Sequence, residues 1–107
     1  MKAIKRDSSK IPNPISNPAA GLIKDTLDHH SLTASTAAQA MHIPRSRFTD
    51  IFKGRKAVSA DTALRLERYL GIPAQLLLRL QAEFDFQKIY HSKRAAIASE
   101  IAPLAHS

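Results

Sequence analysis

The sequence predicts an all-α domain of five helices, and three observations support this fold class. Apolar residues recur three and four positions apart through residues 18–84, whereas no segment there alternates apolar and polar residues as a strand would. Residues that favour helix starts, and glycines that favour helix ends, divide this stretch into segments of typical helix length. At 107 residues, of which 44% are hydrophobic, the chain has the size of one domain with one core.

The first 16 residues are expected to form a flexible basic arm. Prolines, serines and asparagines interrupt this stretch, which carries too little apolar surface to fold by itself. Its basic side chains could follow a DNA backbone or enter a minor groove, and they could equally contact a protein partner or serve only solubility. These basic residues are Lys2, Lys5, Arg6 and Lys10.

Two helices are predicted in the first half of the folded domain, which is expected to span residues 17–91. Asn17 and Pro18 supply a cap and a first-turn proline for a helix over residues 18–29. A turn that ends at Thr33, a second cap, leads into a short alanine-rich helix over residues 34–41. The small side chains of this helix allow a neighbouring helix to pack closely against it.

A third helix is predicted to follow at once. Pro44 has the backbone φ of a helix start, and Phe48, Ile51 and Phe52 are spaced to form one apolar face. Gly54 is expected to end this helix as a left-handed cap residue.

Two further helices complete the predicted core. Ser59 caps the fourth helix, with Asp61 in its first turn, and Gly71 stops it. Pro73 opens the fifth helix. The residues expected to face inward are Ala63, Leu66 and Leu70 in the fourth helix and Leu76, Leu77, Leu80 and Phe84 in the fifth.

The helical pattern weakens beyond Gln87, where either a short helix or an extended segment fits the sequence. Lys93 and Arg94 would be unfavourable at a helix N-terminus, and Pro103 limits any helix that begins after them. We therefore assign residues 92–107 to a short C-terminal extension that could contribute to a dimer.

The charge balance indicates a polyanionic partner, because 16 Lys and Arg residues stand against 9 Asp and Glu residues, a formal net charge of +7. Nucleic acid comes first among such partners, although an anionic membrane or an acidic protein would also suit this charge.

The chain has no cysteine, which excludes disulfides and thiolate zinc sites. No apolar run has the length of a spanning helix and the N-terminus lacks an apolar signal core, so we expect a cytoplasmic protein.

From about Leu32 to Gly54 the predicted elements match a helix-turn-helix, which places its second helix in the major groove of DNA. The residues expected to bury the inside of the corner are Ala37, Ala38, Met41, Ile43 and Phe48. The outward face of the second helix would contact base edges through Arg45, Ser46, Arg47, Thr49 and Asp50. Basic residues bracket this helix at both ends and could bind phosphates, although a basic cluster can also be only a solvated face.

Several segments resemble the HigA/VapI family of helix-turn-helix antitoxins, a branch of the Cro and phage-repressor (XRE) type. They are residues 43–48, residues 54–66, which are the most specific, and residues 78–82 with Phe84 and Asp85. The resemblance extends from Asn17 to about Gln87. The chain departs from the family pattern at Ala34, where such repressors often carry a glutamine that supports DNA binding, at Leu77, where tryptophan is usual, and in its longer N-terminal arm.

The resemblance implies a phage-repressor-like domain that dimerises, binds an inverted repeat in its own promoter and neutralises an mRNA-cleaving toxin of the HigB type. It assigns base contacts to the same five residues of the second helix. It also implies phosphate contacts at Thr33, Ser35, Lys53 and Arg55, to which the basic cluster adds Lys56.

A homodimer is expected because one such domain contacts only a few base pairs. Surplus apolar residues in the fifth helix and the tail could form the interface, unless they only complete the core of a monomer. These residues are Leu76, Leu80, Phe86, Ile89, Tyr90, Ile97 and Ile101.

Other function classes fit the sequence less well. No nucleophile and base occur in a recognisable arrangement and there is no glycine-rich phosphate loop, so we expect neither an enzyme nor a cofactor. His29, His30 and His42 are not placed as a set of metal ligands, and no metal site is expected. The main alternative is a free-standing transcriptional regulator of the same fold with no toxin partner. An interaction module that has lost DNA binding would not need the basic outward face.

Overall fold

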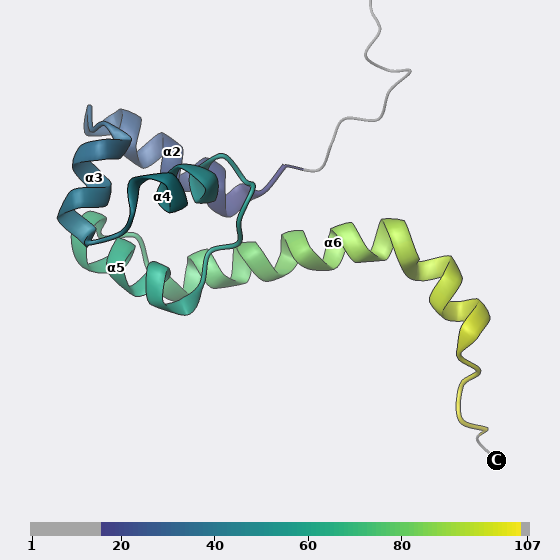
Figure 1. The fold of residues 1–107 in the computed structure, drawn as a ribbon. Helices are drawn as coiled ribbons and strands as arrows, with labels where there is room; N and C mark the ends of the chain where they lie inside the picture. Colours follow the sequence, from purple (N-terminus) through teal and green to yellow (C-terminus); the bar gives the residue numbers. More distant parts are fainter. Residues whose placement is uncertain (1–15, 106–107) are drawn as a thin grey trace, which may run out of the picture.

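The computed structural model describes residues 16–105, and within them every regular element is a helix. Figure 1 shows the five helices, which are α2 (Pro18–His29), α3 (Ala34–Met41), α4 (Arg45–Phe52), α5 (Ala60–Leu70) and α6 (Ala74–Glu100). The predicted all-α class with five helices is therefore confirmed for this part of the chain. The expected basic arm lies outside the described residues except for Ser16.

Three helices begin at the capping side chains that the sequence indicates. The Asn17 Oδ1 atom accepts a hydrogen bond from the Ala19 N–H at 2.9 Å at the start of α2. The Thr33 hydroxyl caps α3 at 3.1 Å, and the Ser59 hydroxyl caps α5 at 3.2 Å. Each cap satisfies an N–H group that would otherwise have no partner within the helix. At the other end of α5, Gly71 adopts a left-handed φ of 76° and stops the helix as predicted.

The core lies where α2, α3, α4 and α5 meet the first half of α6. Helix α6 packs against α2 and α5, α4 packs against α2 and α3, and α3 packs against α5. The largest fully buried side chains come from four helices and are Ile23, Phe48, Leu66 and Leu77. Burial of each such side chain stabilises the fold by about 1.5–3 kcal/mol.

Helix α6 is longer than the sequence predicts, because it continues as one helix of 27 residues to Glu100. Neither a separate short helix nor an extended segment beyond Gln87 is correct. Lys93 and Arg94 lie in the helix interior, away from the N-terminus where the helix dipole would disfavour them. The predicted domain boundary between residues 91 and 92 falls inside this helix, which ends shortly before Pro103.

The buried face of α6 also differs in part from the prediction. Leu77 and Phe84 are buried as expected, but Leu76 is only half-buried and lies outside the core cluster. Leu78 packs against the core in its place, and a polar residue, Gln81, is buried between Leu77 and Phe84. The spacing of apolar residues predicts an apolar face only and therefore gives no sign that Gln81 is buried.

From Phe86 onwards α6 extends away from the other helices and bends before it ends (Figure 1). Its apolar side chains there are exposed, at 58% for Phe86, 49% for Ile89 and 42% for Ile97. The alternative that the surplus apolar residues complete a monomer core is therefore wrong for this exposed part of the helix, whereas Leu80, earlier in α6, does pack against the core. Among the described residues, no helix has both the length and the apolar composition needed to cross a membrane.

Candidate nucleic-acid interface

Helices α3 and α4 form the corner that the sequence predicts. His42, directly after α3, adopts a left-handed φ of 58°, and the Ile43 N–H donates to the Ala38 carbonyl at 2.9 Å. These contacts turn the chain and satisfy a carbonyl at the end of α3. All five side chains predicted to bury the inside of the corner are buried. The orientation of α4 relative to α3 is therefore fixed by packing.

The outward face of α4 carries the residues predicted to contact bases. Arg45, Ser46 and Arg47 are exposed, whereas Thr49 and Asp50 are half-buried. Phe48 and Ile51 lie on the opposite face and are buried in the core. Helix α4 therefore presents two cationic side chains and one hydroxyl to solvent from a rigid support.

The C-terminus of α4 is closed by a Schellman motif. Gly54 has a φ of 81°, and its N–H donates to the Ile51 carbonyl at 3.0 Å. The Arg55 and Lys56 N–H groups both donate to the Asp50 carbonyl, at 2.7 and 3.1 Å. This pattern satisfies the last carbonyls of the helix. It also sets the path of residues 53–57, which we call the basic loop because it carries Lys53, Arg55 and Lys56.

Asp50 and Arg55 form an ion pair in which the Arg55 Nε atom lies 3.0 Å from the Asp50 Oδ1 atom. The sequence assigns Asp50 to base contact and Arg55 to phosphate contact. The structure brings these two residues together, so each is already engaged by the other. Arg45, Arg47, Lys53 and Lys56 form no ion pair with a described residue.

The predicted phosphate contacts at the start of α3 lie at a capped helix N-terminus. The Thr33 Oγ1 atom accepts from the Thr36 N–H and donates to the Thr36 hydroxyl, at 3.1 and 3.0 Å. Ser35 is exposed in the first turn. The positive end of the helix dipole at this point favours an anionic group nearby.

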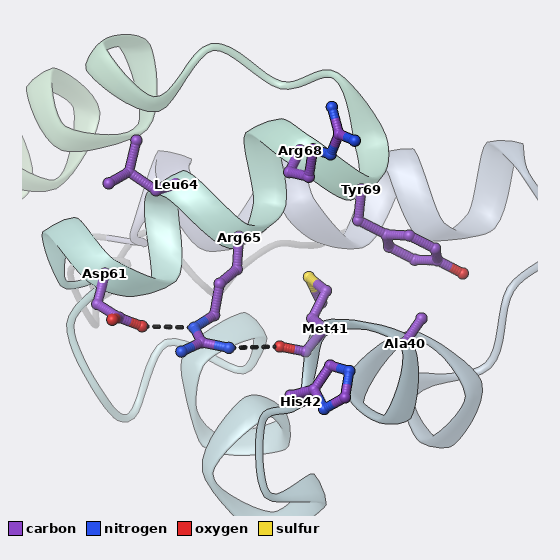
Figure 2. A pocket seen from close by; sticks show the side chains of 8 residues that line it. All are labelled: Ala40, Met41, His42, Asp61, Leu64, Arg65, Arg68 and Tyr69. Carbon is purple, nitrogen blue, oxygen red and sulfur yellow. Dashed lines mark hydrogen bonds and ion pairs between the residues drawn. The ribbon is translucent and has the colours of Figure 1, made fainter.

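Arg65 on α5 is a residue near the interface that sequence reasoning missed. Figure 2 shows its guanidinium between Asp61 and the end of α3. The Nε atom donates to the Asp61 carboxylate at 2.6 Å, and the Nη1 atom donates to the Met41 carbonyl at 2.9 Å. Only the spacing of four residues between Asp61 and Arg65 was a visible signal. The bond to Met41 ties α5 to the helix-turn-helix.

Cations from three elements meet beside α4. Hydrogen bonding and charge attraction from Arg65 lower the pKa of the Asp61 carboxyl, and the charge of Arg47 lowers it further. A groove next to α4 is lined by residues of α4, the basic loop and the first half of α5 with its capping residue, among them Arg47, Lys56, Ser59 and Arg65. Arg47 therefore lies in a cationic surface that extends past α4 itself.

A buried corner, an outward basic helix and a basic loop at its end together define a helix-turn-helix domain. The chain belongs to the helix-turn-helix family, whose family model matches residues 23–77. It is also related to Virulence-associated protein I of Dichelobacter nodosus, with 34% identity over 82 residues that cover 77% of this chain and 76% of the relative.

Solved antitoxin structures share this fold over nearly their full length. An addiction module antidote protein of the HigA family from Coxiella burnetii is 28% identical, with a TM-score of 0.72 over 84% of this chain and 98% of that chain. The Pseudomonas aeruginosa antitoxin HigA, solved with the higBA promoter, is 28% identical, with a TM-score of 0.76 over 86% of this chain and 100% of that chain. The family resemblance noted in the sequence is therefore confirmed.

Proposed function

We propose that this chain is a sequence-specific transcriptional repressor and the antitoxin of a type II toxin-antitoxin module. It binds a palindromic operator in its own promoter and neutralises an mRNA-cleaving toxin of the HigB type. The observation that carries this proposal is the similarity to the P. aeruginosa HigA, solved with promoter DNA, across the whole of that chain. The net charge of +7 supports a DNA partner, because Lys and Arg gain affinity by releasing counterions from phosphates.

In this proposal α4 enters the major groove. Arg45 and Arg47 contact guanine, while Ser46 and Thr49 contact base edges or the thymine methyl group. Asp50 holds Arg55 through Oδ1, so a base contact would use its other carboxylate oxygen. The residues proposed to bind phosphates are Thr33, Ser35, Lys53, Arg55 and Lys56, and they lie at both ends of the helix-turn-helix.

A homodimer gives this protein its specificity. The exposed apolar face of α6 includes a hollow lined by Phe86, Ile89, Tyr90 and Ile97. A second copy would cover this face, which a monomer leaves in water at a cost of about 25 cal/mol per Å². The dimer would place two recognition helices about 34 Å apart, in successive major grooves.

The chain acts by binding alone, without catalysis or a cofactor, and meets its operator and its toxin in the cytoplasm.

The first test measures binding of the purified full chain to its own upstream DNA and to a scrambled duplex at two salt concentrations. We expect the promoter to be preferred by about a thousandfold or more, as for a specific repressor. Equal and steeply salt-dependent binding to both duplexes would show that only the basic charge acts, and would overturn the repressor assignment.

A second test separates an antitoxin from a free-standing regulator. The product of the neighbouring gene is expressed alone and together with this chain, and growth and mRNA integrity are measured. An antitoxin restores both and forms a complex with that product. If specific promoter binding is present but no neighbouring product is toxic, the protein is a free-standing regulator.

A further inference from the structure

Gln81 is a buried polar residue of α6 that the proposed DNA contacts do not use. Its side chain is only 6% exposed, and every polar atom of its amide has a partner. The Oε1 atom accepts from the Val58 N–H at 2.9 Å and from the Asn17 Nδ2 atom at 3.0 Å. The Nε2 atom donates to the Asp85 Oδ1 atom at 3.0 Å. Gln81 thus joins α6 to the start of α2 and to the chain after the basic loop.

Asp85 favours the same orientation of the Gln81 amide as the Val58 N–H does. An ionised carboxylate only accepts hydrogen bonds, and the Val58 N–H only donates. A flipped amide would place its oxygen against Asp85 and its NH2 group against Val58, so that two good contacts would become two mispaired ones. The carboxylate of Asp85, one turn further along α6, therefore keeps the Gln81 oxygen turned towards the loop.

The basic loop is held at both of its ends. At the first end, the Schellman motif joins Arg55 and Lys56 to the last turn of α4. At the second end, the Val58 N–H is bound by Gln81, and the Val58 side chain is buried in the core. With both ends fixed, the loop loses little further conformational freedom when its cations bind phosphate.

We propose that Asp85 and Gln81 are positioning residues for DNA binding, which orient the basic loop from a helix that carries none of the proposed DNA contacts. Asp85 holds the Gln81 amide, Gln81 holds Val58, and Val58 fixes the end of the loop that presents Lys53, Arg55 and Lys56. This inference rests on the proposed function. It gives a physical role to two residues of the segment that resembles the antitoxin family.

Charge and position predict opposite effects for the loss of the Asp85 carboxylate. Removal of a negative charge from a protein that binds a polyanion should raise affinity through long-range electrostatics. A positioning role predicts the reverse, because an amide at residue 85 can donate as well as accept and therefore no longer favours only the Gln81 orientation that Val58 needs. The sign of the change therefore separates the two explanations.

The test compares Asp85→Asn with Glu83→Gln by operator binding at one salt concentration, using the full chain. Both substitutions remove one acidic charge from an exposed residue in the same turn of α6, but among the described residues the Glu83 side chain is bonded only to Gln87, at 3.3 Å, and not to Gln81. We expect Asp85→Asn to weaken operator binding by about fivefold or more, and Glu83→Gln to leave it unchanged or slightly tighter. Equal or tighter binding by a folded Asp85→Asn variant would overturn the proposal.

A swapped pair provides the rescue. In the double variant Gln81→Glu with Asp85→Asn, a carboxylate at residue 81 can accept from Val58, Asn17 and the new amide, and the net charge equals that of the wild type. Operator affinity should recover towards the wild-type value. A double variant that folds but binds no better than Asp85→Asn would contradict a positioning role.

Hydrogen exchange of the Val58 amide tests the loop independently of DNA. Its exchange should quicken in Asp85→Asn and remain slow in Glu83→Gln. If the wild type itself shows no preference for its promoter, the proposed function fails, while the exchange comparison still decides whether Asp85 holds the loop. Unchanged exchange in Asp85→Asn would overturn the positioning chain even if DNA binding were specific.

Discussion

Arg45 and Arg47 are exposed on the outward face of α4, and each can donate two hydrogen bonds to a guanine. Replacement of either by alanine should weaken operator binding by about 1–3 kcal/mol for each lost base contact. Arg79→Ala removes the same charge from an exposed position of α6 and controls for the general electrostatic effect. Titration of a labelled operator measures all three variants. A similar loss in each would leave α4 with no special role in reading bases.

The ion pair between Asp50 and Arg55 leads to a second prediction at the residue scale. If Asp50 acts by holding Arg55, Asp50→Asn should change operator affinity in the wild type but not in an Arg55→Gln background. If Asp50 instead contacts a base, its replacement should have the same effect in both backgrounds. A double-mutant cycle on operator affinity measures the coupling. The Arg55 side chain is 60% exposed and solvent screens the pair, so its effect on folding stability should stay below about 1 kcal/mol.

Local signals made the helices from α2 to α5 predictable nearly to the residue. A cap, a first-turn proline or a left-handed residue lies at the boundaries of these helices, and such signals act within a few residues of the chain. The sequence does not predict the continuation of α6, because Lys93 and Arg94 would be unfavourable at the start of a new helix. In an uninterrupted helix these two residues lie far from the N-terminus, where the helix dipole no longer disfavours a positive charge.

Two glycines should respond to alanine in opposite directions, because they occupy different parts of their elements. Gly21 lies inside α2 with open space around it, so Gly21→Ala should stabilise the fold by about 0.5–1 kcal/mol. Gly54 has a φ of 81° in the Schellman motif of α4, so Gly54→Ala should cost about 1–2 kcal/mol. Urea unfolding of the two variants measures both effects. Equal signs would contradict the local conformations assigned here.

The ion pair between Asp61 and Arg65 in α5 should make stability depend on acid pH. Arg65 lowers the pKa of Asp61, so the folded state binds this proton less readily than the unfolded chain. The stabilisation is present above the ordinary value of 3.8 and is lost as the pH falls through the lowered pKa. Asp61→Asn should therefore lose less stability on acidification than the wild type, as measured by urea unfolding at neutral and acid pH. An equal loss in both proteins would show that the ion pair contributes nothing.

At the scale of the whole molecule, the contacts that join distant elements were not visible in the sequence. Arg65 binds the Met41 carbonyl 24 residues away, and Gln81 binds the Val58 N–H 23 residues away. Neither separation leaves a periodic signal, since each contact depends on how the helices pack. The candidate DNA-contacting residues could be named from one helix face and its flanking charges. Their support by α5 and α6 required the packed structure.

The exposed end of α6 makes a prediction about the assembled molecule. Ile89 and Ile97 are 49% and 42% exposed and take no part in the core cluster, so charged substitutions there should leave the fold intact. A combined Ile89→Asp and Ile97→Asp variant should weaken self-association by about thirtyfold or more, as loss of an interface hot spot does. Sedimentation equilibrium measures the association, and circular dichroism checks the fold. Operator affinity should fall while binding to a half-site remains, because each monomer keeps its own recognition helix. If the variant stays dimeric, the second copy docks elsewhere, and the apolar face of α6 would have to serve a different partner.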